Sequence, residues 1–282
     1  MRLDRPIGVY LLMWPTLWAL WFAAEGIPTL KNLSIFLIGL VVMRAAGCVI
    51  NDYADRDIDG LVERTKYRPL PSGEIQPNQA LWLCGGLLSI ALILVLMTNP
   101  LTIALSFGGL AVTAVYPFMK RFTQLPQIGL GVAWAWVVPM SFAAQREELP
   151  RELWLIFAAI VVWTVAFDTY YAMVDRADDL KIGVKSTAVL LGRYDLFMIV
   201  LLQVATLILM SLVGLEFQRG WVYFFSLLVS AGFFANQFRG ARHRERLACF
   251  AAFLNNHRVG MVIFMGIALD YLAESSPVGS YF

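Results

Sequence analysis

The sequence predicts an all-α polytopic membrane protein, with nine transmembrane helices around a central cavity that opens on the cytoplasmic side. Of its 282 residues, 59% are hydrophobic and only 15% are charged, whereas soluble domains average about 45–50% and about 25%. The hydrophobic residues also come in blocks long enough to cross a bilayer, which takes about 20 residues per helix. In addition, the positive charges gather on alternate connections between these blocks.

The nine apolar segments are separated by short connections, in some of which proline and glycine interrupt the pattern. The predicted helices cover residues 7–24, 31–50, 79–98, 101–119, 127–144, 152–174, 194–215, 220–238 and 252–273. No polar stretch is long enough for a separate soluble domain, so residues 1–282 are expected to form a single transmembrane domain. The first segment lacks a small-residue cleavage site and is expected to be a retained helix rather than a signal peptide.

The distribution of Lys and Arg predicts the orientation in the membrane. With a cytoplasmic N-terminus, the cytoplasmic connections carry sixteen of the 22 Lys and Arg residues and the opposite connections carry four. Cytoplasmic loops of membrane proteins are enriched in Lys and Arg in this way. The chain is therefore expected to be a multi-pass protein of the bacterial inner membrane, with its N-terminus in the cytoplasm and its C-terminus in the periplasm.

Two acidic clusters follow the second and the sixth predicted helix, and both lie on the predicted cytoplasmic side. Each cluster occupies the same place in a unit of four helices. We interpret helices one to four and five to eight as a possible internal repeat, with the ninth helix appended.

The first cluster contains Asn51, Asp55 and Asp59, which lie one above another if the second helix continues through them. Like charges at this spacing destabilise a helix by about 0.2–0.5 kcal/mol per pair, so the pattern favours a cation between the carboxylates. Oxygen ligands without His or Cys select a hard ion. Mg²⁺ held by one or two carboxylates together with substrate phosphate fits best.

The second cluster repeats this spacing with Asp175 and Asp179. Two carboxylate sites that face one cavity predict two Mg²⁺ ions that clamp a diphosphate from both sides. The alternative for either cluster alone is a solvated loop of charges, but their symmetric placement favours the metal. Asp57 and Asp178 fall out of this register and are expected to face solvent.

A diphosphate also needs positively charged partners from the protein. Arg64 and Arg68 follow the first cluster with a spacing of four residues, and Arg121 ends the fourth helix. Lys181 and Lys185 follow the second cluster. Each of these residues is a candidate for the diphosphate site, and the alternative for each is an anchor at the cytoplasmic membrane surface.

Four stretches of the sequence, NDYADRDIDG, RTKYRPLPSG, YPFMKRFTQLPQ and AMVDRADDLKIGVKST, resemble the 4-hydroxybenzoate polyprenyltransferases of the UbiA superfamily. The resemblance covers nearly the whole chain. It implies that the two aspartate pairs hold Mg²⁺ and the diphosphate, with Asn51 and Asp52 beside them. It also places Arg64, Arg68 and Arg121 where the family has cationic contacts to the diphosphate.

The resemblance implies Mg²⁺-dependent transfer of a polyprenyl group from its diphosphate to the 3-position of 4-hydroxybenzoate, in ubiquinone biosynthesis. Mg²⁺ and the arginines would stabilise the departing diphosphate while an allylic carbocation forms. Tyr116, Tyr170 and Tyr171 are expected near the cavity, where their rings could stabilise this cation, and helix packing is the alternative for each. The prenyl tail is expected to leave sideways into membrane lipid.

Arg44 and Asp168 each lie seven residues before an acidic cluster, two helical turns deeper in the membrane. The two side chains could pair with each other. Alternatively, Arg44 could bind the carboxylate of the acceptor while Asp168 orients it, because an unpaired buried charge is costly.

Other functional classes fit less well. Intramembrane acids and internal repeats also occur in secondary transporters, but those acids would lie near the bilayer midplane. Prenylation of a different aromatic acceptor is the remaining alternative among enzymes.

A net charge of +2 gives no indication of nucleic-acid binding, and no obligate protein partner is implied. The three cysteines lack CxxC spacing and are expected to be buried, and two histidines are too few for a His-based metal centre.

Overall fold

The computed structural model describes residues 6–60, 65–183 and 185–275. In this part of the chain all regular secondary structure is helical, and nine helical stretches are long and apolar enough to cross a membrane, which confirms the predicted class. The elements in chain order are α1 (Ile7–Ala24), α2 (Leu30–Asp59), α3 (Pro77–Leu96), α4 (Pro100–Phe122), α5 (Pro126–Ala135), α6 (Val137–Arg146), α7 (Leu153–Ile182), α8 (Thr187–Leu191), η1 (Gly192–Tyr194), α9 (Asp195–Glu216), α10 (Trp221–Ala241) and α11 (Arg246–Ser275).

The two helices that carry the acidic clusters are longer than their apolar segments. α2 and α7 each contain 30 residues, and α2 continues through Asp59 while α7 continues through Ile182. α7 ends where Gly183 adopts a left-handed backbone with φ of 73°, a conformation that glycine reaches without strain. Both clusters therefore lie on regular helix, as their spacing predicted.

The fifth predicted segment forms two short helices, α5 and α6, which meet at Trp136. The indole Nε1 of Trp136 donates to the carbonyl of Leu105 at 2.8 Å. Its ring lies against Gly108 and Gly109, where an added Cβ would overlap it. This contact with α4 holds the junction, and the apolar pattern of the segment contains no sign of it.

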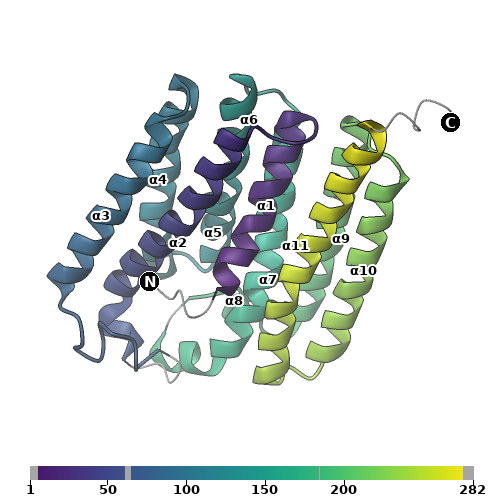
Figure 1. The fold of residues 1–282 in the computed structure, drawn as a ribbon. Coiled ribbons are helices and arrows are strands. Elements are labelled where there is room, and N and C mark those ends of the chain that lie inside the picture. The colour runs from purple at the N-terminus through teal and green to yellow at the C-terminus, as the bar shows by residue number, and fades with distance from the viewer. Residues whose placement is uncertain (1–5, 61–64, 184, 276–282) are drawn as a thin grey trace.

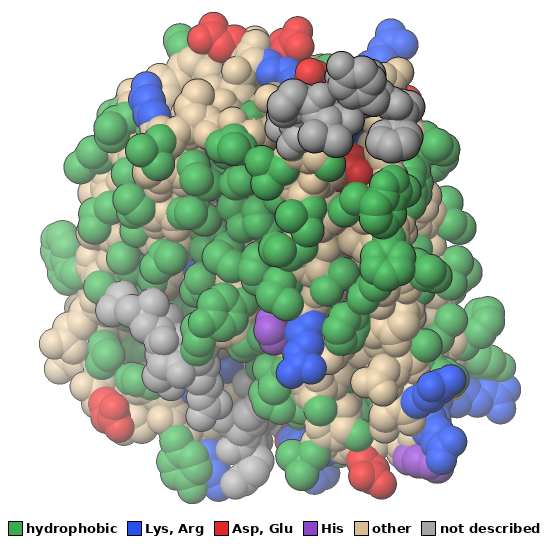
Figure 2. Space-filling model, turned by 45° about the vertical axis from the view of Figure 1, so that its right-hand side comes forward, with side chains coloured by type: hydrophobic (Ala, Val, Ile, Leu, Met, Phe, Trp, Pro, Cys, Tyr) green, Lys and Arg blue, Asp and Glu red, His purple; other side chains and the backbone are tan. Residues whose placement is uncertain are grey.

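The long helices run side by side, with α3 and α4 at one side of the bundle and α9 and α10 at the other (Figure 1). α1 starts and α11 ends at opposite ends of the bundle, as nine crossings require. On the face shown in Figure 2, hydrophobic side chains cover the middle of the molecule and most charged side chains lie toward its two ends. This is the distribution expected of a protein that spans a bilayer.

The main hydrophobic core lies among α1, α5–α7 and α9–α11, and its largest fully buried side chains include Trp18, Trp163, Tyr170 and Tyr223. α3 and α4 differ from these helices, because only 11% of the membrane-spanning window of each is buried inside the protein. The part of the bundle beside α2, α3 and α4 is thus loosely packed, and this leaves room for a cavity.

All three cysteines are buried and free, as predicted. The internal repeat stays a prediction. α2 and α7 have equal lengths, and each ends at or soon after an acidic cluster.

The backbones of α5 and α7 lie close together, and a substitution at their contact can test this packing. A Cβ at Gly131 would lie 3.0 Å from the carbonyl oxygen of Val161 and 3.1 Å from its Cα. Gly131→Val is expected to force the two backbones apart and to destabilise the protein by about 1–3 kcal/mol, the usual cost of overpacking. Thermal unfolding of purified protein measures the effect. Gly85→Val is the matched control, because nothing lies within 4 Å of a Cβ at Gly85. Equal unfolding temperatures for the two variants would contradict this account.

Candidate active site

A cavity of about 1160 Å³ lies among α2, α3, α4, α5 and α7. Both acidic clusters contribute to its wall, although about 120 residues separate them in the chain. The residues of the two clusters that line it are Asn51, Asp52, Asp55, Asp59, Asp175 and Asp179. The fold thus brings together the two sites that the sequence predicted to face one cavity.

The acids of α2 are buried at the end of the helix and share a positively charged partner. Asp52, Asp55 and Asp59 are 9%, 1% and 6% exposed. Nη1 of Arg68 lies 3.2 Å from Oδ1 of Asp52 and 2.5 Å from Oδ2 of Asp59. The hydroxyl of Thr65 donates to the carbonyl of Asp59 at 2.8 Å, which ties Thr65 to the end of α2. Arg68 therefore reaches the wall from the connection that follows α2.

The acids of α7 also have a cationic neighbour, which the sequence did not identify. Nη2 of Arg246, the first residue of α11, lies 3.7 Å from Oδ1 of Asp175 and 2.8 Å from Oδ2 of Asp178. Asp178 is half-buried beneath this contact, so the expectation that it faces solvent was wrong. Asp57 does face solvent, and 77% of its side chain is exposed.

The remaining predicted cations are placed differently from one another. Lys185 lines the cavity, and its Nζ donates to the carbonyl of Phe122 at 3.4 Å. Lys181 is exposed and does not line the cavity, because residues two positions apart on a helix, such as Asp179 and Lys181, point in nearly opposite directions. Arg64 and the side chain of Arg121 lie outside the described residues.

Aromatic rings cover part of the wall near the acids. Tyr116 and Tyr171 line the cavity, whereas Tyr170 does not line it and is fully buried in the core, which is the helix-packing alternative that the sequence left open. The ring of Tyr171 lies 4.7 Å from that of Phe253 and 6.3 Å from that of Phe250, and both phenylalanines line the cavity. Sequence reasoning missed these two residues, because phenylalanines in an apolar helix look the same whether they face a core or a cavity.

Arg44 and Asp168 line the same cavity, at a deeper level than the clusters. Nη1 of Arg44 contacts the Sγ of Cys48 at 2.9 Å, and its guanidinium occupies the space beside Gly8 that a Cβ would fill. No ion pair joins Arg44 to Asp168 in the described part of the chain. The direct pairing that the sequence allowed is therefore not observed.

The ligand chemistry of the acidic pairs suits a hard cation. Among the described residues, no three His, Cys, Asp or Glu side chains form a ready-made metal site. A pair of carboxylates on each helix leaves most of the coordination shell to water and to substrate oxygens. Mg²⁺ is usually bound in this way, by one or two carboxylates and the phosphates of its substrate.

The cavity changes in character along its length. Beyond the charged end its wall is formed largely by apolar side chains of α3 and α4, among them Leu88, Leu92, Val95 and Phe107. A site with charged groups at one end and a long apolar wall fits an amphipathic substrate with an anionic head and a hydrocarbon tail.

Because Arg68 bridges two carboxylates, its replacement is expected to lower the stability of the folded protein. Arg68→Gln deprives the buried carboxylates of Asp52 and Asp59 of a shared charged partner. Loss of such hydrogen bonds typically costs about 1.5–3 kcal/mol, so the unfolding temperature of the ligand-free protein should fall. Arg56→Gln is the control, since Arg56 lies 3.8 Å from the exposed Asp57 and should leave that temperature unchanged. Equal unfolding temperatures for both variants and the unchanged protein would argue against the bridge.

Comparisons with known proteins identify the family of this chain. The model of the UbiA prenyltransferase family matches residues 12–265. The chain is 57% identical over 271 residues to a 4-hydroxybenzoate octaprenyltransferase of Ectopseudomonas mendocina, covering 96% of this chain and 92% of the relative. It is 58% identical over 272 residues to the enzyme of the same name from Saccharophagus degradans, with 96% and 91% covered.

Solved structures share the fold. A UbiA homolog from Aeropyrum pernix K1 superimposes with a TM-score of 0.83 at 25% identity, covering 96% of this chain and 99% of the other. A UbiA homolog from Archaeoglobus fulgidus bound to GPP and Mg²⁺ gives a TM-score of 0.70 at 20% identity, with 95% and 98% covered. The family match and the identity to curated relatives together show that this chain belongs to the UbiA prenyltransferase family.

Proposed function

We propose that this enzyme transfers a polyprenyl group from its diphosphate to the 3-position of 4-hydroxybenzoate, in ubiquinone biosynthesis. The observation that carries the proposal is the single cavity with two aspartate pairs at one end and an apolar wall beyond them. Relatives at 57% and 58% identity are named 4-hydroxybenzoate octaprenyltransferases, which favours this acceptor and an eight-unit donor.

The two aspartate pairs are the proposed binding site for Mg²⁺. Asp55 and Asp59 would hold the ion on the α2 side, and Asp175 and Asp179 on the α7 side. Mg²⁺ bound there would neutralise charge on the diphosphate as it leaves. The homolog from Archaeoglobus fulgidus that was solved with GPP and Mg²⁺ supports a divalent ion in this fold.

Arg68 and Lys185 are the described cations proposed to bind the diphosphate. The guanidinium of Arg68 already contacts two carboxylates on the wall, and its planar donors match phosphate oxygens equally well. Asn51 can add an amide donor from the first turn of the cluster. Arg64 and Arg121 are proposed as further contacts on the basis of the sequence resemblance.

In the proposed reaction the allylic C1–O bond breaks and its electron pair leaves with the diphosphate. The rings of Tyr116, Tyr171 and Phe253 on the cavity wall present π-faces that can stabilise the resulting cation. The ring carbon ortho to the phenol of 4-hydroxybenzoate attacks C1, and loss of the proton from that carbon restores aromaticity. The apolar wall limits the access of water, which would otherwise capture the cation.

We also propose that the enzyme lies in the bacterial inner membrane, with the acidic end of the cavity toward the cytoplasm. The excess of Lys and Arg on that side supports this orientation. It places the N-terminus in the cytoplasm and the C-terminus in the periplasm.

The proposal is tested with radioactive 4-hydroxybenzoate, polyprenyl diphosphate and the purified protein in liposomes. Label should move into a lipid-soluble product only when Mg²⁺ is present, and EDTA should stop the transfer until Mg²⁺ is restored. Asp55→Ala and Asp175→Ala should each lower kcat at least about 100-fold, the usual scale for losing one electrostatic contact to the transition state. Asp57→Ala should retain activity, because Asp57 faces solvent on the same helix.

Transfer that continues in EDTA would contradict the metal site. Transfer to other phenolic acids but not to 4-hydroxybenzoate would show that the proposed acceptor is incorrect. Movement of an ion or solute without any product would instead indicate a transporter.

Arg44 is the proposed partner of the acceptor carboxylate, with Asp168 beside it as the orienting group. Arg44→Ala should raise the KM for 4-hydroxybenzoate by about tenfold for each 1.4 kcal/mol of binding that is lost. The KM for polyprenyl diphosphate should stay nearly constant, because Arg44 lies two turns away from the aspartates. Gly8→Ala should shift the acceptor KM in the same direction, since its methyl group displaces the guanidinium.

Thermal unfolding of both variants serves as the control for folding. A normal acceptor KM in well-folded Arg44→Ala would remove this residue from the acceptor site.

A further inference from the structure

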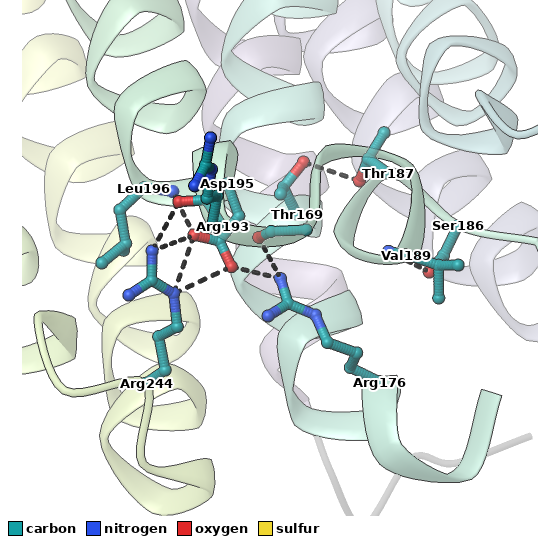
Figure 3. Close-up of polar contacts among 10 residues, drawn as sticks. Thr169, Arg176, Ser186, Thr187, Val189, Arg193, Asp195, Leu196 and Arg244 are labelled. Carbon is teal, nitrogen blue, oxygen red and sulfur yellow. Dashed lines mark hydrogen bonds and ion pairs between the residues drawn. The ribbon is translucent and has the colours of Figure 1, made fainter. Parts of the chain in front are cut away.

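Arg176, Asp195 and Arg244 form a cluster of charged side chains (Figure 3), and none of the three lines the cavity. The centre of the cluster is Asp195, the first residue of α9, whose side chain is fully buried. Asp195 accepts a hydrogen bond from Nη2 of Arg176 on α7. It also accepts from Arg244 in the turn between α10 and α11, at 3.0 Å from Nε and 2.9 Å from Nη2. One buried carboxylate thus joins α9 to α7 and to the turn between α10 and α11.

The same two arginines also donate hydrogen bonds to backbone carbonyls just before Asp195 in the chain. Nη2 of Arg176 donates to the carbonyl of Gly192 at 3.2 Å, and Nη2 of Arg244 donates to the carbonyl of Arg193 at 2.8 Å. The connection between α8 and α9 is therefore fixed from both sides.

The backbone of Arg244 has an unusual conformation. Its φ is 58°, in the left-handed region that residues other than glycine seldom adopt. Hydrogen bonding to Asp195 also raises the pKa of Arg244 above its ordinary value. Two residues later, Arg246 reaches Asp178 and Asp175. The acidic end of α7 is therefore contacted directly by Arg246 at the start of α11, and it is linked through Arg176 and Asp195 to Arg244 in the turn just before it.

The position of Arg176 relates this cluster to the reaction. Arg176 lies between Asp175 and Asp179 in the sequence and points about 60–100° away from them around the helix axis. When Asp195 holds Arg176 on the outer side of α7, the last turns of the helix cannot rotate freely. Asp175 and Asp179 then keep facing the cavity.

The connection that carries Lys185 depends on the same cluster. The hydroxyls of Thr187 and Thr169 are hydrogen-bonded at 2.8 Å, which joins the start of α8 to α7. On the other side of α8, the carbonyl of Gly192 is held by its hydrogen bond from Arg176. Lys185 and Ser186, which line the cavity, are thus attached to a segment that is fixed on both sides.

We infer that Asp195 is a positioning residue for the transfer reaction: through Arg176 and Arg244 it holds the second aspartate pair and Lys185 in place on the cavity wall. Asp195 contacts neither metal nor substrate in this role. A buried ion pair adds little net stability compared with apolar side chains of similar size, so a purely stabilising role explains the cluster poorly. The inference rests on the proposed function of the cavity.

The test replaces the buried carboxylate by an amide of the same shape. In Asp195→Asn, the Mg²⁺ concentration for half-maximal activity is expected to rise about tenfold, and kcat/KM for polyprenyl diphosphate to fall by at least that factor. The KM for 4-hydroxybenzoate is expected to stay constant, because its proposed partner Arg44 lies on another helix. Arg176→Gln should have the same effects, and the double variant should be no worse than the more affected single variant.

Asp270→Asn is the matched control. Asp270 is also a buried carboxylate, and its Oδ2 accepts from the backbone of Gly220 at 2.7 Å and lies 3.7 Å from Arg219. It lies near the end of α11 that is remote from Arg246, far from the aspartate pairs. This variant should lower the unfolding temperature without altering the Mg²⁺ dependence.

A second measurement does not depend on activity. Binding of Mn²⁺ in the presence of inorganic diphosphate, followed by electron paramagnetic resonance, should be weaker in Asp195→Asn and unchanged in Asp270→Asn. Unchanged Mn²⁺ binding and Mg²⁺ dependence in folded Asp195→Asn would overturn the inference, as would equal changes in Asp270→Asn.

A milder variant covers the case in which Asp195→Asn does not fold. Arg244→Lys keeps the charge but loses the fork of donors, and it should shift both titrations in the same direction by a smaller factor. Wild-type titrations in Arg244→Lys would then overturn the inference. Failure of the proposed function is distinguishable, because the unchanged enzyme would make no product while the Mn²⁺ titrations would still report on the aspartates.

Discussion

Carboxylates repel one another and lose hydration when they are buried, yet α2 and α7 direct two pairs of them onto one cavity wall. This repulsion must be balanced by positive charge, and the neighbouring connections supply it. Arg68 comes from the connection after α2, and Arg246 comes from the first turn of α11. The acidic end of the bundle therefore requires positive charge nearby. A bound metal ion and an arginine that binds the diphosphate would both supply it.

The aspartates and the apolar wall have complementary tasks in the proposed reaction. The charged end binds and activates the diphosphate, whereas the apolar and aromatic surface holds the tail and shields a reactive cation. Tyr171 and Phe253 mark the border between the two regions, since their rings lie 4.7 Å apart on helices that both approach the acidic end. The charged groups that activate the diphosphate and the apolar groups that exclude water thus lie in different parts of one cavity.

Local periodicity was enough to predict the nine membrane-spanning segments and the helical spacing of the four aspartates, because both depend on residues that are close in sequence. The extension of α7 beyond its apolar segment was harder to predict in detail. Once that extension is known, its geometry explains why Lys181 points away while Asp179 lines the cavity. The same helical rotation separates Tyr170 from Tyr171.

Contacts between distant segments could not be predicted from the sequence. Arg246 is 68 residues from Asp178, and Arg244 is 49 residues from Asp195. Nothing in the basic stretch around the start of α11 distinguishes these two arginines from Arg239 and Arg242, and all four are exposed. Only the packing of α11 and α9 against α7 gives them partners.

α3 and α4 bury little of their surface against the rest of the protein, although they form much of the apolar wall. The outer faces of these two helices are therefore expected to lie against acyl chains of the surrounding bilayer. Detergent micelles replace these chains with smaller, more mobile molecules that pack less evenly against the two helices. The activity of this enzyme is therefore expected to depend on the lipid around α3 and α4. A preparation that removes this lipid is expected to alter the wall of the cavity.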